Sequence, residues 1–359
     1  MSPNVSAAFS FTVLLFSLSA WTGYASAAGP RCSAEQGQRY IDEGRYRQAV
    51  REFTCLIDAQ PTEVEGYRGR IEAELLLGEF SNAVRDYARV TAFVLPVHPD
   101  ARNIIVAGYD ARLAISPHNI AALTGASFAH WWFFEYARAI QTLNRLLDVA
   151  SDDVHGNLFR GSSRLLLGAT PFQGAADLDR AIALAPSSPD VRFIVADAYT
   201  YGQPDPDRAF AEASLALNWG LDTPRIRAIL ASAYQALGEP QAAAVQISIH
   251  LAQVTTQLVP TSPLTAGSSF SLGLVPGRTY EIPLSVIAGE TLKVSTSSRD
   301  FFDTILVLLA PDGSPVVGSD DASNFFAALD WVAEATATYR MRVTSFESVN
   351  TGELIVRRK

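Results

Sequence analysis

The feature that most constrains this chain is a short pattern that recurs through its first two thirds with a period of roughly 34 residues. The first copy contains a glycine, a small residue five positions later and a bulky apolar residue four positions after that, at Gly44, Ala49 and Phe53. The second copy starts one period further on, at Gly78. The small residues of the other copies are Ala83, Ala139, Gly174, Ala209 and Ala243. Self-similarity at a period of this length indicates a stack of similar supersecondary units.

Each copy has the residues that a helical hairpin needs. A glycine such as Gly44 or Gly168 suits the tight turn between two helices, and the small residue lets the second helix approach the first. Prolines such as Pro61 and Pro186 then end the second helix. Because one hairpin cannot bury its apolar face alone, several have to stack into a solenoid. We therefore predict about six helical hairpins over residues 30–255.

The pattern resembles the tetratricopeptide repeat. The likeness is carried by Tyr67 and Arg70 followed by Leu77-Gly78, and by the segment 177–186. It implies an all-α, right-handed superhelical solenoid whose concave face is lined by the first helix of each hairpin. The resemblance also implies protein binding, in which a partner peptide or helix lies in the concave groove.

Two stretches depart from the repeat. The step from Ala83 to Ala139 exceeds one repeat unit by enough chain to form a further helix with its connections. We interpret residues 98–115 as an additional helix or a degraded half repeat. Residues 131–134, which read Trp-Trp-Phe-Phe, replace the usual turn glycine. These departures concern the local register of the repeats and not the fold.

The hydrophobic period changes after the repeats, beyond a linker predicted over residues 256–265. Apolar residues that alternate with polar ones, as at Tyr280 and Ile282, indicate half-buried strands. The continuous apolar run 305–309 suits a strand that is buried on both faces. Seven or eight such strands, separated by turn signals, predict an all-β antiparallel sandwich of jelly-roll type over residues 266–359.

This second domain resembles the bacterial pre-peptidase C-terminal domain over residues 266–357. The matching residues are Ala288-Gly289-Glu290-Thr291, Asp303-Thr304, Pro311-Asp312-Gly313, Asp320-Asp321, Tyr339, Val343 and Gly352. In that family the domain follows a peptidase, whereas in this chain it follows helical repeats. The resemblance therefore implies a sandwich fold and an exported setting, and it does not imply proteolysis.

The N-terminus predicts export. No charged side chain occurs over residues 1–30, and an apolar stretch over residues 9–20 is followed by Ala-Ser-Ala at residues 25–27. This arrangement is typical of a secretory signal peptide over residues 1–27, and cleavage would leave a periplasmic or extracellular protein without a transmembrane segment. An uncleaved anchor is the alternative, because no Lys or Arg precedes the apolar stretch.

Export would allow the two cysteines to form a disulfide, because disulfides persist in oxidising compartments. Cys32 precedes Gly44 by nearly as many positions as Cys55 follows it. An antiparallel hairpin with its turn at Gly44 would bring the two side chains to the same level. We predict a Cys32–Cys55 disulfide; two unrelated thiols are the alternative.

Composition and motifs argue against several functions. The formal net charge of -9 disfavours nucleic acid as a partner. The sequence has no Gly-x-Ser-x-Gly motif, no histidine followed by glutamate and no glycine-rich phosphate loop. We therefore predict a non-enzymatic protein without a cofactor; an enzyme whose site is assembled from residues distant in sequence is the least favoured alternative.

Calcium is the one metal that the sequence suggests. Asp303, Asp320 and Asp321 could gather around this hard cation, which prefers carboxylate oxygens. The alternative is that each of them accepts backbone hydrogen bonds within its own turn.

The candidate partner-binding residues are those predicted on the concave face. They are Arg68, Glu72, Leu75, Leu76, Phe128, Trp131 and Trp132. The last three share one helix face in the densest aromatic patch of the chain. The alternative is that these rings pack against the additional helix at 98–115.

The sequence thus predicts an exported adaptor that holds a protein or peptide partner in the groove of its repeats. The sandwich would dock a second partner or a cell-surface polymer. In the alternative, a carbohydrate- or matrix-binding accessory protein, the sandwich does the recognition and the repeats are a spacer.

Overall fold

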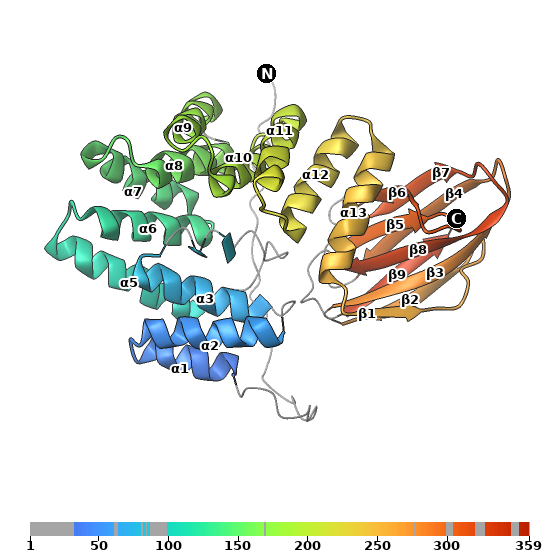
Figure 1. Ribbon diagram of the computed structural model, residues 1–359, viewed down its shortest axis with the longest axis horizontal. Helices are drawn as coiled ribbons and strands as arrows, with labels where there is room; N and C mark the ends of the chain where they lie inside the picture. Colours follow the sequence, from blue (N-terminus) through green and yellow to red (C-terminus); the bar gives the residue numbers. More distant parts are fainter. Residues whose placement is uncertain are drawn as a thin grey trace, which may run out of the picture. The chain divides into compact units, whose positions relative to one another are not determined.

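The computed structural model describes residues 32–60, 64–79, 82–83, 85–86, 99–168, 170–275, 277–298, 304–319, 327–345 and 352–358. Figure 1 shows a succession of helices followed by strands in two sheets. The predicted signal peptide and the calcium candidates Asp303, Asp320 and Asp321 lie outside the described residues. Within the described part of the chain, no helix is long and apolar enough to cross a bilayer.

Twelve described helices form the repeats. They are α1 (Ala34–Asp42), α2 (Tyr46–Ala59), α3 (Val64–Leu77), α5 (Pro99–Ile115), α6 (Ile120–Trp132), α7 (Tyr136–Val149), α8 (Val154–Leu167), α9 (Pro171–Leu184), α10 (Pro189–Tyr201), α11 (Pro206–Asn218), α12 (Pro224–Ala236) and α13 (Pro240–Val254). Consecutive helices pack as hairpins, and first helices also contact one another, as α8 and α10 do. The predicted helical solenoid is confirmed, and α5 lies where an additional helix is predicted.

The small residues of the repeat lie where the two helices of a hairpin meet. Ala49, Ala139 and Ala243 are completely buried. Between α8 and α9 the contact is so close that a Cβ on Gly161 would lie 2.8 Å from the carbonyl oxygen of Gly174. A larger side chain at this position would therefore force the hairpin apart.

Most turns inside the hairpins contain the expected glycine in a left-handed conformation. The φ angles of Gly44 and Gly168 are 71° and 67°. In the α6–α7 turn this place is taken by Phe134, whose φ of 60° is the one positive value among the described residues other than glycine. A side chain with a Cβ is strained in this region, so the Trp-Trp-Phe-Phe run replaces glycine at an energetic cost.

The additional helix α5 packs between two hairpins. Its Tyr109 is buried, and the phenol group donates a short hydrogen bond to the carbonyl oxygen of Leu75 on α3. On the other side, the ring fills the space beside Gly125 of α6, where a Cβ would lie 2.2 Å from ring atoms. Glycine is therefore needed at this point of α6 so that the tyrosine ring can approach the helix.

The predicted Cys32–Cys55 disulfide is confirmed. It joins the start of α1 to α2, with the two Cα atoms 5.9 Å apart and 23 residues apart in sequence. The two cysteines therefore lie at the same level of the first hairpin, as their positions on either side of Gly44 predict.

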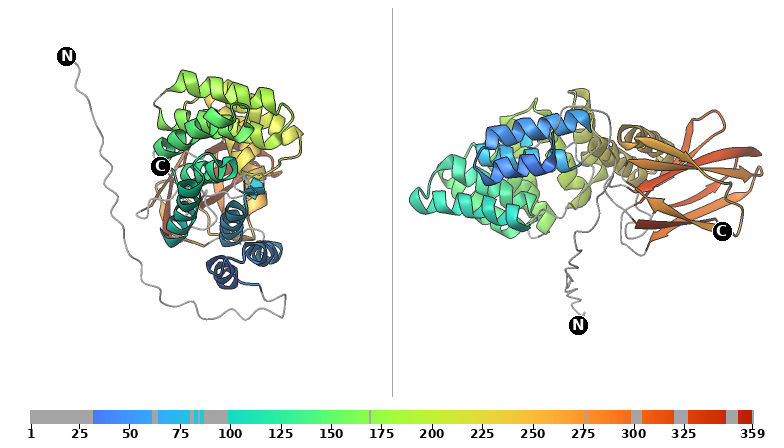
Figure 2. Two further views of the ribbon diagram at one scale, coloured as in Figure 1. Left: turned by 90° about the vertical axis from the view of Figure 1, so that its left-hand side faces the viewer. Right: turned by 90° about the horizontal axis from the view of Figure 1, so that it is seen from below.

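The strands form two stacked sheets (Figures 1 and 2). They are β1 (Gln257–Pro260), β2 (Ser269–Leu274), β3 (Arg278–Val286), β4 (Thr291–Ser298), β5 (Thr304–Leu309), β6 (Pro315–Ser319), β7 (Ala328–Val332), β8 (Ala337–Ser345) and β9 (Gly352–Arg358). One sheet has the order β1-β3-β8-β5-β6, and the other has the order β2-β9-β4-β7. The sandwich prediction is confirmed, with one difference: β1 lies in the predicted linker and pairs with β3 in parallel.

Strand β5 is buried on both of its faces, as its apolar run predicts. Leu306 and Leu308 point into the core between the sheets. Ile305 and Val307 point the other way, into a separate apolar cluster with α12 and α13 that includes Ile247. The last helical hairpin therefore covers the outer face of β5.

Candidate functional site

The structure buries most of the side chains that the sequence places on an open concave face. Leu75 and Phe128 are completely buried, and Trp131 and Trp132 are only 4% and 7% exposed. Glu72 and Leu76 are buried as well. The prediction that these side chains are exposed for a partner is therefore wrong, because they are core residues of the solenoid.

Arg68 differs from the rest of this set, because its side chain is 19% exposed. Its guanidinium forms an ion pair with Glu65 at 2.7 Å and lies 3.9 Å from Glu72. Arg68 keeps a partly accessible position, so its role in partner binding stays a prediction.

The aromatic patch of α6 contacts α8. The ring centroids of Trp131 and Phe128 lie 5.1 and 4.8 Å from that of Phe159. The indole N–H of Trp131 donates a hydrogen bond of 3.0 Å to Ser162 on the same helix. The alternative prediction, that these rings pack against residues 98–115, stays a prediction, although α5 does contact α6.

Helix α6 is closed on all sides. Every residue from Ala122 to Trp132 is buried. A first helix that lined an open groove would expose one face, whereas a helix that is apolar all round is an interior helix. We call the side formed by α3, α6, α8, α10 and α12 the inner side, and residues 122–132 of α6 offer no exposed face on it.

Arginine pairs hold the two helices of a hairpin together. On α8, Arg160 makes a bidentate pair with Asp177 of α9, with N–O distances of 2.9 and 2.7 Å, and also donates to Asn144 of α7. Arg70 of α3 makes the equivalent pair with Asp86. Because these charges are satisfied by the hairpins themselves, we assign them to architecture.

Sequence reasoning missed these pairs, although a signal was present. The residue three positions after the small repeat residue is Asp86, Asp177, Glu212 or Gln246 in four of the copies. All four accept a hydrogen bond from an arginine on the first helix of the same hairpin. A polar residue in phase with a buried small residue is the pattern that could have predicted them.

One carboxylate on the inner side is less well satisfied. Asp190, the second residue of α10, has a side chain that is 14% exposed. Its Oδ2 atom accepts one hydrogen bond, of 3.3 Å, from Nε of Arg85, and its Oδ1 atom is buried without a hydrogen-bond partner among the described residues. We call Asp190, Arg85 and the nearby His155 the Asp190 site; sequence reasoning did not single out any of them as partner-binding residues.

Electrostatics link the three residues of the Asp190 site. Burial raises the pKa of Asp190, and the charges of Arg85 and His155 act in the opposite direction. Burial lowers the pKa of His155, whose ring is stacked on Phe159 with a centroid distance of 6.1 Å. His155 is therefore predominantly neutral near pH 7, which leaves Arg85 as the cation that contacts the carboxylate within the described part of the chain.

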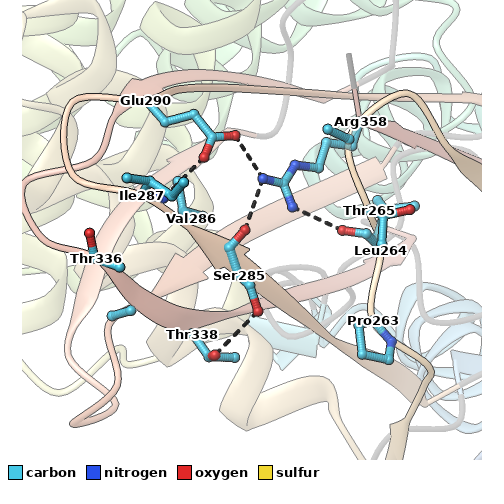
Figure 3. A pocket seen from close by; sticks show the side chains of 12 residues that line it. Pro263, Leu264, Thr265, Ser285, Val286, Ile287, Glu290, Thr336, Thr338 and Arg358 are labelled. Carbon is cyan, nitrogen blue, oxygen red and sulfur yellow. Dashed lines mark hydrogen bonds and ion pairs between the residues drawn. The ribbon is translucent and has the colours of Figure 1, made fainter.

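The sandwich carries a hollow of about 560 Å³ at the end of β3, β8 and β9 (Figure 3). Arg358 crosses its floor and donates hydrogen bonds to the carbonyl oxygens of Leu264 and Ser285 and to the carboxylate of Glu290. The guanidinium of Arg358 therefore links the end of β9 to the end of β3 and to the segments around Leu264 and Glu290. Its accessible polar groups include the hydroxyls of Ser285 and Thr338 and the carboxylate of Glu290, whose side chain is 32% exposed.

No group of three or more metal-binding side chains comes together among the described residues. The calcium candidates lie outside this part of the chain. Among the histidines, His250 is buried with Nδ1 2.9 Å from the carbonyl oxygen of Pro224. The Asp190 site and the sandwich hollow are the two candidate sites taken up below.

Comparison with known proteins agrees with the two resemblances at the level of the fold. No family model matches this chain, and no curated protein matches its sequence. A thermophilic tetratricopeptide protein from Thermus thermophilus is 20% identical, with 56% of this chain and 97% of that chain covered and a TM-score of 0.34. A tetratricopeptide repeat protein from Parabacteroides merdae is 16% identical, with 62% and 78% covered and a TM-score of 0.38.

The sandwich has its own structural match. The pre-peptidase C-terminal domain of a Bacillus anthracis collagenase is 11% identical, with 29% of this chain and 95% of that domain covered and a TM-score of 0.25. The chain is thus similar to tetratricopeptide proteins in its repeats and to a pre-peptidase C-terminal domain in its sandwich. The helical repeats and the two sheets of this chain have the fold that both resemblances imply.

Proposed function

We propose that this chain is an exported, non-enzymatic scaffold that holds a segment of a partner protein on the inner side of its repeats. Support for a rigid frame comes from the apolar core, which runs from Ile41 to Ala233. A frame that is already folded binds a partner without a large ordering cost of its own. Export is supported by the Cys32–Cys55 disulfide, because such bonds persist outside the reducing cytosol.

The observation that carries the proposal is the contact between Arg85 and Asp190. These residues are 105 positions apart, and Arg85 belongs to the second hairpin whereas Asp190 belongs to the fifth. The inner side at α10 therefore already accommodates a side chain from a hairpin that is not adjacent to α10 in the stack. A partner segment needs the same kind of access.

The sandwich is proposed as a second docking module. Its hollow is open to solvent and is bordered by the exposed side chain of Ile287 as well as by hydroxyls. The hydroxyls of Ser285 and Thr338 favour the alternative function, in which the sandwich recognises a cell-surface polymer rich in hydroxyl groups.

Site-specific photo-crosslinking in the full chain tests the proposal. A benzoylphenylalanine would replace Arg85, whose side chain reaches the inner side, Ile287 at the sandwich hollow, or Val149 at the end of α7, in cells that make the protein naturally. We expect a protein adduct from position 85 and none from position 149, the matched exposed control. Adducts from position 287 without any from position 85 would favour the polymer-binding or second-partner role and overturn the inner-side scaffold.

A further inference from the structure

We infer that Asp190 is the receptor for a cationic side chain, a guanidinium or ammonium group, of the bound partner segment, and that Arg85 of the chain itself fills this place in the free protein. This inference rests on the proposed function, because it names the chemistry of the segment held on the inner side. The site consists of Asp190 on α10, His155 on α8 and the side chain of Arg85.

The first argument is the poor geometry of the Asp190–Arg85 pair. Asp177 receives two hydrogen bonds of 2.9 and 2.7 Å from Arg160, one on each carboxylate oxygen. Asp190 receives a single one from Arg85, at 3.3 Å, on one oxygen. Guanidinium and carboxylate groups bind best through two parallel hydrogen bonds, so Arg85 leaves half of the binding capacity of Asp190 unused.

The second argument is the unsatisfied oxygen. Oδ1 of Asp190 is buried and has no hydrogen-bond partner in the described part of the chain. A buried acceptor without a donor is costly, and natural proteins retain few of them. A cation that reached both oxygens would remove this cost, which gives a partner segment an advantage over Arg85.

The third argument is that Arg85 can leave. Its side chain is 55% exposed, whereas the side chain of Arg160 is 20% exposed. The guanidinium is the exposed half of this pair, so an incoming cation can take its place while Asp190 stays paired. Arg160 and Arg70, by comparison, join the two helices of their own hairpins, so they cannot be exchanged without opening a hairpin.

The charge of the whole chain acts in the same direction. A formal net charge of -9 favours the approach of cationic segments and disfavours anionic ones. His155 next to Asp190 is held neutral by burial, so it does not repel an incoming cation. The occupant that fits is therefore an extended segment with an arginine or lysine.

The test uses the Arg85→Ala variant of the full chain, in which the place beside Asp190 is vacant. The probes are two fluorescein-labelled Gly-Ser decapeptides, one with a central arginine and one with citrulline, its neutral isostere, and binding is measured by fluorescence anisotropy. We expect the arginine peptide to bind about tenfold more tightly than the citrulline peptide, which is the effect of one charge-assisted hydrogen-bonded pair. In wild-type protein we expect a smaller preference, because Arg85 competes.

Adding Asp190→Asn to Arg85→Ala should abolish the preference for arginine. Asp179→Asn is the matched control, because it removes the same charge from an exposed aspartate that pairs with Arg208. A preference that survives Asp190→Asn, or no preference in Arg85→Ala, overturns the inference. Circular dichroism melting of each variant shows whether the fold is intact.

Crosslinking separates this inference from the proposed function. If the position-85 adduct forms equally well with Asp190→Asn, the scaffold stands and the cation receptor is wrong. If no adduct forms at position 85 in the otherwise unchanged chain, the scaffold proposal itself fails, whatever the peptides show.

Discussion

The side chain of Ile247 on α13 lies directly against the backbone of Gly318 on β6. A Cβ at position 318 would stand 2.7 Å from Cδ1 of Ile247 and 3.3 Å from Cα of Ala244. The contact belongs to the same region in which Ile305 and Val307 of β5 pack against α12 and α13. Glycine at this point allows the last helix to sit close to the sheet, so the junction between repeats and sandwich depends on a missing side chain.

We predict that Gly318→Val lowers the free energy of unfolding by about 1–3 kcal/mol, the usual cost of overpacking a tight contact. The reason is that the branched side chain meets both Ile247 and the backbone of α13. Urea unfolding followed by circular dichroism measures the effect. Gly273→Val on β2 is the control, because a Cβ there has no heavy atom of the described residues within 4 Å. Equal losses in the two variants would contradict the close contact.

Phe134 leads to a prediction of the opposite sign. Because its φ is 60°, Phe134→Gly should raise the free energy of unfolding by about 1 kcal/mol. The ring is 47% exposed and makes an edge contact with Tyr136, so little packing is lost. The reciprocal change Gly168→Ala, at a φ of 67° and with no described atom crowding the Cβ, should lower it by a similar amount. Thermal melts of both variants check this pair, and a stabilising Gly168→Ala would refute the strain argument.

The hairpins and the strands could be predicted because their signals are local. The position of Ala49 after Gly44 is set by the geometry of one turn and one helix, and so is the level of Cys32 and Cys55. The double-sided burial of β5 could also be read from its continuous apolar run. These features need no knowledge of what lies beside them in space.

The candidate site could not be predicted in the same way. Whether Trp131 lines a groove or lies in a core depends on what covers α6, and periodicity does not report this. The all-round apolar character of α6 was the available signal, since such helices are interior. The contact between Arg85 and Asp190 joins positions 105 residues apart, and nothing in the local pattern indicates it.

Two buried glutamates on α3 predict how stability depends on pH. Burial raises the pKa of Glu74 to about 8 and that of Glu72 to about 7, from an ordinary value of 4.5. Between pH 4.5 and these raised pKa values, Glu72 and Glu74 keep their protons in the folded chain but have lost them in the unfolded chain. The contribution of each protonated carboxyl group to the free energy of unfolding is therefore complete below about pH 4.5, and it is lost as the pH rises towards 7 for Glu72 and 8 for Glu74. The loss amounts to up to about 1.4 kcal/mol per pH unit for each group.

Glu74→Gln tests this dependence. The neutral amide should flatten the fall in stability between pH 5 and pH 8.5 and leave the variant more stable than wild type at the upper end. Urea unfolding at a series of pH values measures the slope. Glu239→Gln, at an exposed position just before α13, is the control, because Glu239 is not among the charges that act on Glu72 or Glu74. An unchanged slope in Glu74→Gln would mean that the carboxylate is already charged in the folded protein over this pH range.

The last prediction concerns the buried pair of Asp197 on α10 and Arg225 on α12. Both side chains are 2% exposed, and Nε and Nη2 of the arginine lie 3.0 and 2.7 Å from the same carboxylate oxygen. Asp197→Asn leaves the guanidinium buried without this counter-charge, so we expect a loss of about 3–5 kcal/mol in the free energy of unfolding. Asp152→Asn, which removes the carboxylate of an exposed pair with Arg180, should cost less than about 1 kcal/mol. Urea unfolding of the two variants measures the difference, and similar small losses in both would show that the pair between α10 and α12 is open to water.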